Sequence, residues 1–509
     1  MTKQRVAAAA VGLLILAVYL LRLDHVAGIV GDDAWYALLG RTLARGDGFQ
    51  QANAPTPGLL PIVPPGFPLL LLPLWYVAPA FPANVLTLKS ISIAAMLATA
   101  ALSYTYSRLR TEWSRELALI VAAAVALVPS LVWLATSTLM SDSAFLAVQL
   151  GSLVALERWT TRTGVAVAGV GAGVAVLIRT IGVALPAGVV LYLCATRQWR
   201  RAMVFAAVVF ALLAPWQIYA RLHAPTPAQR RASGEVLLSY GQQFWQQWAG
   251  DPYGGTATLR DIPMRVFDNG ADVISRDVVA LVSPLLIRGP QQSGLEVLSV
   301  GSYATPGRMG NGLVTRIVST ALFVLIAVGW WRAARRRCSS AEVVVPLSLA
   351  LVVVWPFWSY RFVLPLTPFL LIYLVDGLRA LTPEAERVPA LVMLGVVLLA
   401  VLDHGEYIAR AAAEPPEWSI YAEDTDQVLT WLQQHPPRGV VATTNPALVY
   451  LRTGAPTIAL EGGRIERAAL TARGVQYVVS VNPAGLRVPR EQGLVRYVSP
   501  RCGFWVLEF

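Results

Sequence analysis

The chain has 509 residues, of which 56% are hydrophobic and 14% are charged, and its mean hydropathy is +0.55. This composition excludes an ordinary soluble protein and indicates an α-helical membrane protein. The net charge of +11 does not indicate nucleic acid binding, because the basic residues occur in short clusters between apolar runs.

Apolar runs recur along the chain, each near the roughly 20 residues that a helix needs to cross a bilayer. The basic clusters fall on alternate loops, so the positive-inside rule places the N-terminus in the cytoplasm. The runs at 164–178 and 180–196 are short and meet at Arg179, so they form either a bent hairpin or a re-entrant pair. In total, eleven spans are predicted, at 6–23, 85–107, 117–134, 142–156, 164–178, 180–196, 202–220, 314–332, 343–357, 361–378 and 388–403.

Three other segments are predicted on the outer face. The loop at 24–84 contains LLPIVPPGFPLLLLPLWYVAPAFP, which is apolar enough for the membrane interface, although its prolines interrupt a regular helix. The loop at 221–313 is rich in Gln, Trp and Gly and is predicted to form a lid or wall. The composition of a soluble protein begins near residue 405. We therefore expect a transmembrane domain at 1–404 and an extracytoplasmic α/β domain at 405–509.

The tail alternates between helical and strand patterns. DTDQVLTWLQQH has helical spacing, with Asp424 or Thr425 as the expected N-cap, and GVVATT, QYVVSV, LVRYVS and GFWVLEF are typical of short strands. The tail has no glycine-rich phosphate loop, zinc spacing or nucleophile elbow. We interpret it as a module for packing or for docking an acceptor.

The first outer loop contains two adjacent carboxylates, Asp32 and Asp33, in GDDAWYALLGRTLARGDGF. An Asp at the start of a helix caps free N–H groups and favours the positive end of the helix dipole. A second carboxylate exceeds what a cap requires, and such a pair can act as a general base or hold a cation. Tyr36 lies one turn further on, and Gly46 is expected to end the helix.

Three more charged residues are predicted on the same face. Asp142, in LATSTLMSDSAFLAV, either begins the fourth span as a cap together with Ser141 or forms a second acidic site. Arg179 and Arg361 either reach lipid headgroups or bind an anion, and the planar fork of arginine suits a phosphate. This set suits an activated phosphate substrate that is attacked by a nucleophile which a carboxylate deprotonates.

The order of these motifs resembles the GT-C membrane glycosyltransferases, especially the branch of the protein O-mannosyltransferases and the aminoarabinose transferases. GDDAWY, RGDGF and VPPGFPLLLLPLW follow one another as in the first outer loop of that branch. LMSDSAF, LIRTIGVALP and SYRFVLPLTPF are similar to its second acidic site, its Arg-bearing junction and its Arg-Tyr-Leu-Leu-Pro element. The resemblance covers about residues 1–220 and 314–403.

The resemblance implies a GT-C fold and an inverting glycosyltransferase of the bacterial inner membrane. It would transfer a hexose or pentose from a polyprenyl-phosphate donor to a hydroxyl of a lipid, glycan or protein at the outer face. By position, Asp32 would be the base and Asp142 the second acid, while Arg179 and Arg361 would hold the donor phosphate. Membrane lipids are the other expected partners.

Other residues predicted at the outer face are also candidates for the site. Asp33 is the second carboxylate of the pair, and Tyr36 and Tyr360 are candidate substrate-binding residues. No cofactor is certain, although Asp33 and Asp142 could hold a divalent metal ion. Asp33 stands where the branch has Glu, and Val63 stands where aminoarabinose transferases have Lys, which argues against a strict aminoarabinose transferase.

The alternative function is a translocator of lipid-linked sugars without transferase activity. Transporters more often show inverted repeats and broken helices at the middle of the membrane. This sequence shows no such symmetry, and its charged residues gather at one face, so the transferase is favoured.

Overall fold

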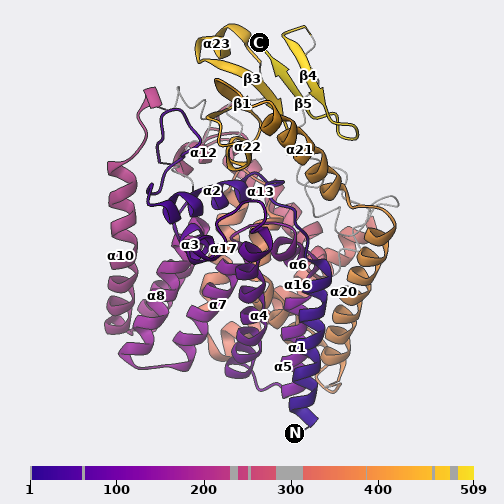
Figure 1. Ribbon diagram of the computed structural model, residues 1–509. Coiled ribbons are helices and arrows are strands. Elements are labelled where there is room, and N and C mark those ends of the chain that lie inside the picture. The colour runs from indigo at the N-terminus through magenta and orange to yellow at the C-terminus, as the bar shows by residue number, and fades with distance from the viewer. Residues whose placement is uncertain are drawn as a thin grey trace.

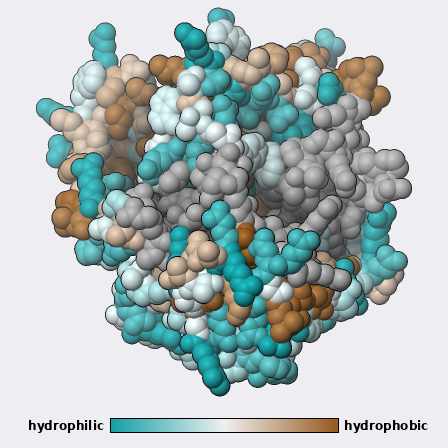
Figure 2. Space-filling model, turned by 90° about the horizontal axis from the view of Figure 1, so that it is seen from above, coloured by the Kyte–Doolittle hydropathy of each residue, from teal (hydrophilic) through white to brown (hydrophobic). Residues whose placement is uncertain are grey.

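The computed structural model describes residues 3–59, 63–229, 239–249, 254–282, 313–385, 387–460, 465–481 and 491–509. A bundle of helices carries a small sheet at one end, and the N-terminus lies at the opposite end (Figure 1). Seen from the sheet end, hydrophilic side chains cover much of the surface (Figure 2). This end therefore has the character of a surface that faces water.

Every predicted apolar run overlaps a helix or a helix pair. Of the part described, six helical stretches are long and apolar enough to cross a membrane, and a bent pair would make a seventh. The chain is thus a multi-pass membrane protein, while the count of eleven spans stays a prediction. The helices are α1 (Lys3–Arg22), α4 (Val85–Arg110), α5 (Arg115–Ala126), α6 (Pro129–Thr136), α7 (Asp142–Arg158), α8 (Arg162–Ile178), η1 (Thr180–Val183), α9 (Ala184–Ala195), α10 (Trp199–Leu222), α16 (Leu313–Arg337), α17 (Ala341–Val354), α18 (Tyr360–Val363), η5 (Leu364–Leu366), α19 (Thr367–Leu381) and α20 (Val388–Ala413).

Two proline effects differ from expectation. The run predicted as one span at 117–134 is broken, because α6 starts at Pro129 and is bent by 53° from α5. Proline lacks the N–H that would continue the helix, and its ring collides with the preceding turn. The Pro-rich stretch, in contrast, forms the 12-residue helix α3 (Gly66–Val77) with Pro73 inside it. Pro68 lies in the first turn, where N–H groups have no helical partner in any case.

The described parts of the segments predicted as outer loops lie at the sheet end of the bundle (Figure 1). α2 (Asp32–Arg45) ends at Gly46, whose φ of +79° gives the left-handed cap that the sequence predicted. The described parts of the loop at 221–313 include α12 (Tyr240–Phe244), α13 (Ile262–Asp272), the π-helix η2 (Val273–Asp277) and α14 (Val278–Val282). Residues 230–238, 250–253 and 283–312 of that predicted loop lie outside the described residues.

The tail forms an α/β unit, as predicted. Its strand order is β2-β1-β3-β5-β4, in which β1 is parallel to β2 and β3 while β5 is antiparallel to β3 and β4. All four predicted strands are present, and the short β2 was not predicted. The elements are α21 (Glu417–Gln434), β1 (Val440–Thr443), α22 (Pro446–Thr453), β2 (Thr457–Ala459), α23 (Arg467–Ala472), β3 (Val475–Ser480), β4 (Leu494–Val498) and β5 (Trp505–Glu508).

The predicted N-cap of the tail helix is wrong. α21 begins at Glu417, so Asp424 and Thr425 lie well inside it. Asp424 is buried, and its carboxylate accepts hydrogen bonds from the N–H groups of Arg501 and Cys502 at 3.0 and 2.6 Å. Its side chain thus fixes the turn before β5 instead of capping a helix.

Ion pairs lie near both ends of the helical bundle. Arg110 contacts Glu157 at 3.4 Å and Glu342 at 3.3 Å, next to the last turn of α7. Asp142 is the first residue of the same helix. A rise of 1.5 Å per residue separates Asp142 from Glu157 by about 22 Å. The two charged clusters are therefore distinct, and the one around Asp142 lies at the sheet end.

Candidate functional site

Asp142 is the centre of the charged cluster at the sheet end. It follows Ser141, the N-cap residue of α7, as the sequence predicted, and its side chain is 1% exposed. Arg361, on α18, places Nη2 3.1 Å from Oδ2 and Nε 3.4 Å from Oδ1. Nη1 of Arg179 lies 2.6 Å from the same Oδ2. One buried carboxylate is thus shared by two arginines.

Arg361 also reaches Asp32, at the start of α2. Its Nη1 lies 3.3 Å from Oδ2 of Asp32, whose side chain is 50% exposed. Arg361 itself is 9% exposed at its side chain. The guanidinium therefore connects one carboxylate that solvent cannot reach with one that solvent and substrates can reach.

Arg179 occupies the break between α8 and η1. Its extended backbone, with φ −144° and ψ 125°, ends α8 and turns the chain into η1. The short contact of Nη1 with Asp142 does not have the geometry of a hydrogen bond, and among the described residues this buried nitrogen has no hydrogen-bond partner. A buried N–H group without an acceptor is costly, so its presence favours a site that binds an anion.

Asp33 lies next to Asp32 in sequence but in a different environment. It is fully buried, and its oxygens accept the N–H groups of Gly28 at 2.8 Å and Ala34 at 3.0 Å. The pKa of the Asp33 carboxyl is raised to about 6, mainly by burial and also by the charge of Asp32, while the two hydrogen bonds and Lys89 act to lower it. Asp33 is thus placed to hold the backbone before α2, out of reach of a substrate.

The two candidate tyrosines have buried hydroxyl partners. The hydroxyl of Tyr36 lies 3.0 Å from Oγ of Ser141, and burial raises the pKa of Tyr36. This contact connects the helix of Asp32 with the start of the helix of Asp142. The hydroxyl of Tyr360 lies 2.8 Å from Oγ of Ser130 on α6. The structure therefore brings Tyr36 to the charged cluster and gives Tyr360 a partner on another helix.

Tyr240 is near the cluster and was not predicted. Its hydroxyl shares a hydrogen bond with Thr180, the residue after Arg179, and Asp32, Arg179 and Arg361 are close enough to act on its pKa, which burial raises. It starts α12 in the long Gln- and Trp-rich loop. Its only signal in the sequence was that this loop was expected to cover the outer face.

The predicted metal ligands do not fit a metal in this arrangement. Within the described ranges, no group of three or more His, Cys, Asp or Glu side chains could hold a metal ion. The oxygens of Asp33 accept hydrogen bonds from backbone N–H groups. Those of Asp142 form ion pairs with two arginines, whose positive charge would repel a cation.

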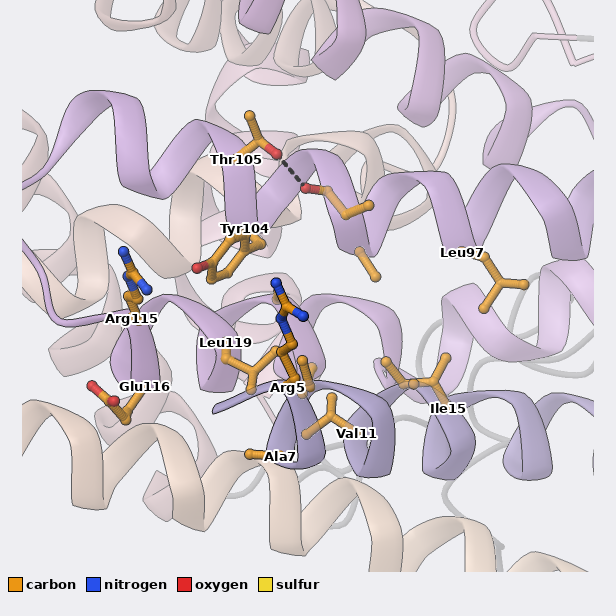
Figure 3. A pocket seen from close by; sticks show the side chains of 16 residues that line it. Arg5, Ala7, Val11, Ile15, Leu97, Tyr104, Thr105, Arg115, Glu116 and Leu119 are labelled. Atoms are coloured by element: carbon orange, nitrogen blue, oxygen red, sulfur yellow. Dashed lines mark hydrogen bonds between the residues drawn. The ribbon is translucent and has the colours of Figure 1, made fainter. Parts of the chain in front are cut away.

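A cleft of about 920 Å³ lies apart from this cluster, between α1, α4 and α5 (Figure 3). Arg5, Tyr104 and Arg115 lie toward one end of it, and Ile15 and Leu97 line the other. Its described lining residues come from these three helices only. The cleft is therefore not part of the candidate site.

Comparisons with known proteins support the fold. A sequence model of Glycosyltransferase family 87 matches residues 62–253, a range that includes Asp142 and Arg179. No curated protein sequence matches the chain.

Solved structures give a wider likeness. The oligosaccharyltransferase AglB of Archaeoglobus fulgidus, in complex with an inhibitory peptide and a dolichol-phosphate, has a TM-score of 0.56 at 14% identity over 94% of this chain and 70% of AglB. The apo form of the Archaeoglobus fulgidus oligosaccharyltransferase has a TM-score of 0.57 at 15% identity, over 94% and 69%. ArnT of Cupriavidus metallidurans bound to undecaprenyl phosphate has a TM-score of 0.48 at 16% identity, over 100% and 98%. The likeness to the archaeal enzyme shows that the chain shares its fold, the GT-C fold that the motifs predicted.

Proposed function

We propose that this chain of GT-C fold is an inverting glycosyltransferase that moves a sugar from a polyprenyl-phosphate donor to an acceptor hydroxyl. The observation that carries the proposal is the position of Arg361 between the exposed Asp32 and the buried Asp142, with Arg179 beside it. The match to Glycosyltransferase family 87 supports a glycosyltransferase. AglB, which shares the fold, binds a dolichol-phosphate, and this supports a donor of the polyprenyl-phosphate class.

In this proposal the two arginines bind the donor phosphate, and Asp142 positions them. A guanidinium offers several N–H groups in one plane, so it can bond a carboxylate and a phosphate at the same time. Nη1 of Arg179 is buried and has no hydrogen-bond partner among the described residues, so a phosphate oxygen would satisfy it. Asp142 touches both arginines and is too buried to meet an acceptor.

Asp32 is the proposed general base. Its carboxylate is paired with Arg361 in the structure, and a phosphate that takes over Nη1 would leave Asp32 free to accept a proton. The acceptor oxygen would then bond to the anomeric carbon while the bond from that carbon to the phosphate oxygen breaks. The acceptor proton passes to Asp32, and the leaving phosphate keeps the electron pair, stabilised by the arginines. A single in-line displacement inverts the anomeric centre.

The proposed location is the outer face of the bacterial inner membrane. The positive-inside rule places Arg335, Arg336 and Arg337, at the end of α16, in the cytoplasm. The carbonyl oxygen of Arg337 accepts a hydrogen bond from Arg110, in the cluster opposite the candidate site. The N-terminus would then be cytoplasmic, and the domain at 405–509 would be extracytoplasmic together with the loops at 24–84 and 221–313. The donor chain would lie among the helices of 1–404.

The test uses the full chain reconstituted in liposomes with polyprenyl-phosphate hexose or pentose donors and an envelope extract as acceptor. Release of polyprenyl phosphate and formation of a glycoside are measured. We expect Asp32→Asn to lower transfer by at least about 100-fold, because a positioned base contributes about 10²- to 10⁴-fold. Asp47→Asn, the same change at an exposed residue just beyond α2, serves as the matched control and should retain the wild-type rate.

Two results would contradict the proposal. Full transfer by Asp32→Asn would show that Asp32 is not the general base. Movement of the sugar lipid across the bilayer by the wild-type chain, without formation of a glycoside from any donor, would favour the translocator. Mass spectrometry of envelope glycoconjugates from a deletion strain would then identify the acceptor class.

A further inference from the structure

The C-terminal domain contacts the backbone that precedes α2. Asn445 lies between β1 and α22, and its Nδ2 donates a hydrogen bond to the carbonyl oxygen of Gly28 at 2.8 Å. The N–H of Gly28 in turn donates to Oδ2 of Asp33 at 2.8 Å. Asn445, Gly28 and Asp33 are all buried, and Asp33 directly follows Asp32 in the sequence. A short path of hydrogen bonds therefore runs from the domain to the start of α2.

The fit at Gly28 is close. Its φ is +88°, and a Cβ atom built there would lie 2.7 Å from Cδ2 of Leu448, on α22. Residues other than glycine rarely adopt this φ. A Cβ atom at 2.7 Å from another carbon would also collide with it. Gly28 thus lets the backbone of the first outer loop lie directly against α22.

The domain also contacts α2 itself and the chain beyond it. Nη1 of Arg41 donates to the carbonyl oxygen of Leu451 at 3.3 Å. The N–H of Thr457 donates to the carbonyl oxygen of Asn53 at 2.7 Å, and Nδ2 of Asn53 donates to Oγ1 of Thr457 at 3.1 Å. The segment that carries Asp32 is therefore held by the domain before, along and after α2.

The backbone before Asp32 depends on such contacts. Gly28 and Gly31 both have positive φ, at +88° and +86°. Glycine has more accessible conformations than any other residue, so a segment with two of them has a large entropy to lose when it becomes ordered. Contacts from outside the loop are thus needed to fix the direction in which α2 starts.

We propose that the C-terminal domain positions the catalytic carboxylate, through the hydrogen bond from Asn445 to Gly28 and that from Gly28 to Asp33. This inference rests on the proposed function, because it takes Asp32 as the base. Asn445 is a positioning residue, since its side chain donates to the backbone of the loop and acts on Asp32 only through that backbone. A displacement of the base by about 1 Å can lower the reaction rate on the order of 100-fold. A single hydrogen bond to the backbone before α2 therefore matters for catalysis.

The two functions of Asn445 can be separated by substitution. Its Oδ1 accepts the N–H of Leu448 at 3.3 Å and so caps α22, while Nδ2 donates to Gly28. Asn445→Asp keeps an acceptor for the cap, loses the donor, and sets a carboxylate against the Gly28 carbonyl oxygen. Asn445→Ser keeps a cap of normal strength but is too short to reach Gly28. Both variants therefore break the contact with the loop and preserve α22.

A matched control lies in the same domain. Nε2 of the exposed Gln433 donates to the carbonyl oxygen of Arg452 at 2.6 Å. Gln433→Glu makes the same chemical change as Asn445→Asp, from an amide donor to a carboxylate beside a carbonyl oxygen. It does so between α21 and the last turn of α22, at the end of α22 opposite to Asn445.

The experiment compares these variants in the full reconstituted chain. For Asn445→Asp and Asn445→Ser we expect kcat to fall about 10- to 100-fold while KM for the donor stays within twofold, because the arginines are untouched. Hydrogen exchange of the backbone at 26–34 should become faster, and Tm should stay within a few degrees of wild type. Gln433→Glu should leave kcat and this exchange unchanged.

The outcomes separate this inference from the proposed function. If Asn445→Asp and Asn445→Ser keep the wild-type kcat while Asp32→Asn is inactive, the domain does not position the base and the inference is wrong, although the proposed function stands. A loss of kcat that Gln433→Glu shares to the same extent would also overturn it, because the effect would then come from the stability of the domain. Full activity of Asp32→Asn would overturn the proposed function itself.

Discussion

Arg361 holds Asp142 with two nitrogens, Nε at 3.4 Å from Oδ1 and Nη2 at 3.1 Å from Oδ2. This fork leaves Nη1 to reach Asp32 at 3.3 Å. A lysine ammonium is a point charge and cannot bond both oxygens of one carboxylate in a plane while it contacts a second. The arrangement therefore requires arginine, and charge alone does not account for it.

We expect Arg361→Lys to raise KM for the donor by about 10-fold or more and to lower kcat, because one tenfold change in binding corresponds to about 1.4 kcal/mol, the scale of one charge-assisted hydrogen bond. Arg179→Lys should have a smaller effect, since Arg179 makes a single ionic contact with Asp142. Initial rates at varied donor concentration measure both. Equal kinetic constants for Arg361→Lys and the wild type would show that the fork is not used.

A second prediction concerns the stability of the cluster. Asp142→Asn leaves two arginines, each about 8% exposed, without a shared counter-ion, and removal of one partner from a buried ion pair costs about 3–5 kcal/mol. In detergent, we expect Asp142→Asn to lower the free energy of unfolding by this amount. The double variant Asp142→Asn/Arg361→Gln should lose less than Asp142→Asn alone, because one of the two uncompensated charges is then gone. Asp47→Asn serves as the control. If the two losses simply add, the pair is not coupled and the prediction is wrong.

Charged residues in apolar surroundings were the part of the site that the sequence could predict. Asp32, Asp142, Arg179 and Arg361 stand out because an ion next to a membrane span needs a reason. Which of Asp32 and Asp33 faces solvent could not be predicted, because neighbouring helical residues point about 100° apart and the docking of α2 decides between them. The sequence also gave no sign of the contact between Tyr240 and Thr180, which joins two distant segments.

The fold shows the same division. Each of the eleven predicted apolar runs is helical, but α3 forms in a stretch whose prolines were expected to interrupt a helix. The break between α5 and α6 lies within one continuous apolar run and depends on Pro129. The strand β2 covers only Thr457–Ala459, too short a stretch to show alternation. The contact between Asn445 and Gly28 spans 417 residues of sequence and is set by packing alone.

A third prediction concerns pH. The pKa of Asp33 is about 6 in the folded chain, against about 3.9 in an unfolded one, and burial is the main cause. Because the folded state binds this proton more tightly, the stabilisation is complete below about pH 4 and is lost as the pH rises through about 6. The difference amounts to about 3 kcal/mol at most. Asp32 acts to raise this pKa, and Lys89 acts to lower it.

We therefore expect the wild-type chain to become more stable from pH 7 to pH 5, and Asp33→Asn to show a weaker dependence over the same interval. Thermal unfolding in detergent at pH 5, 6 and 7 measures this difference. Asp47→Asn, at an exposed position, should keep the wild-type dependence. Identical pH dependence of the wild type and Asp33→Asn would mean that Asp33 does not titrate in this range.

The last prediction concerns Tyr36, which is either a substrate-binding residue or a connection between α2 and α7. The buried contact of its hydroxyl with Ser141, at 3.0 Å, favours the connection. A buried hydrogen bond contributes about 1 kcal/mol, so Tyr36→Phe and Ser141→Ala should each destabilise the chain, with a coupling of about 1 kcal/mol in a double-mutant cycle. KM for donor and acceptor should then change little in Tyr36→Phe. A raised KM for Tyr36→Phe without coupling to Ser141→Ala would contradict this. It would show that the Tyr36 hydroxyl binds the substrate and that its contact with Ser141 does not contribute to stability.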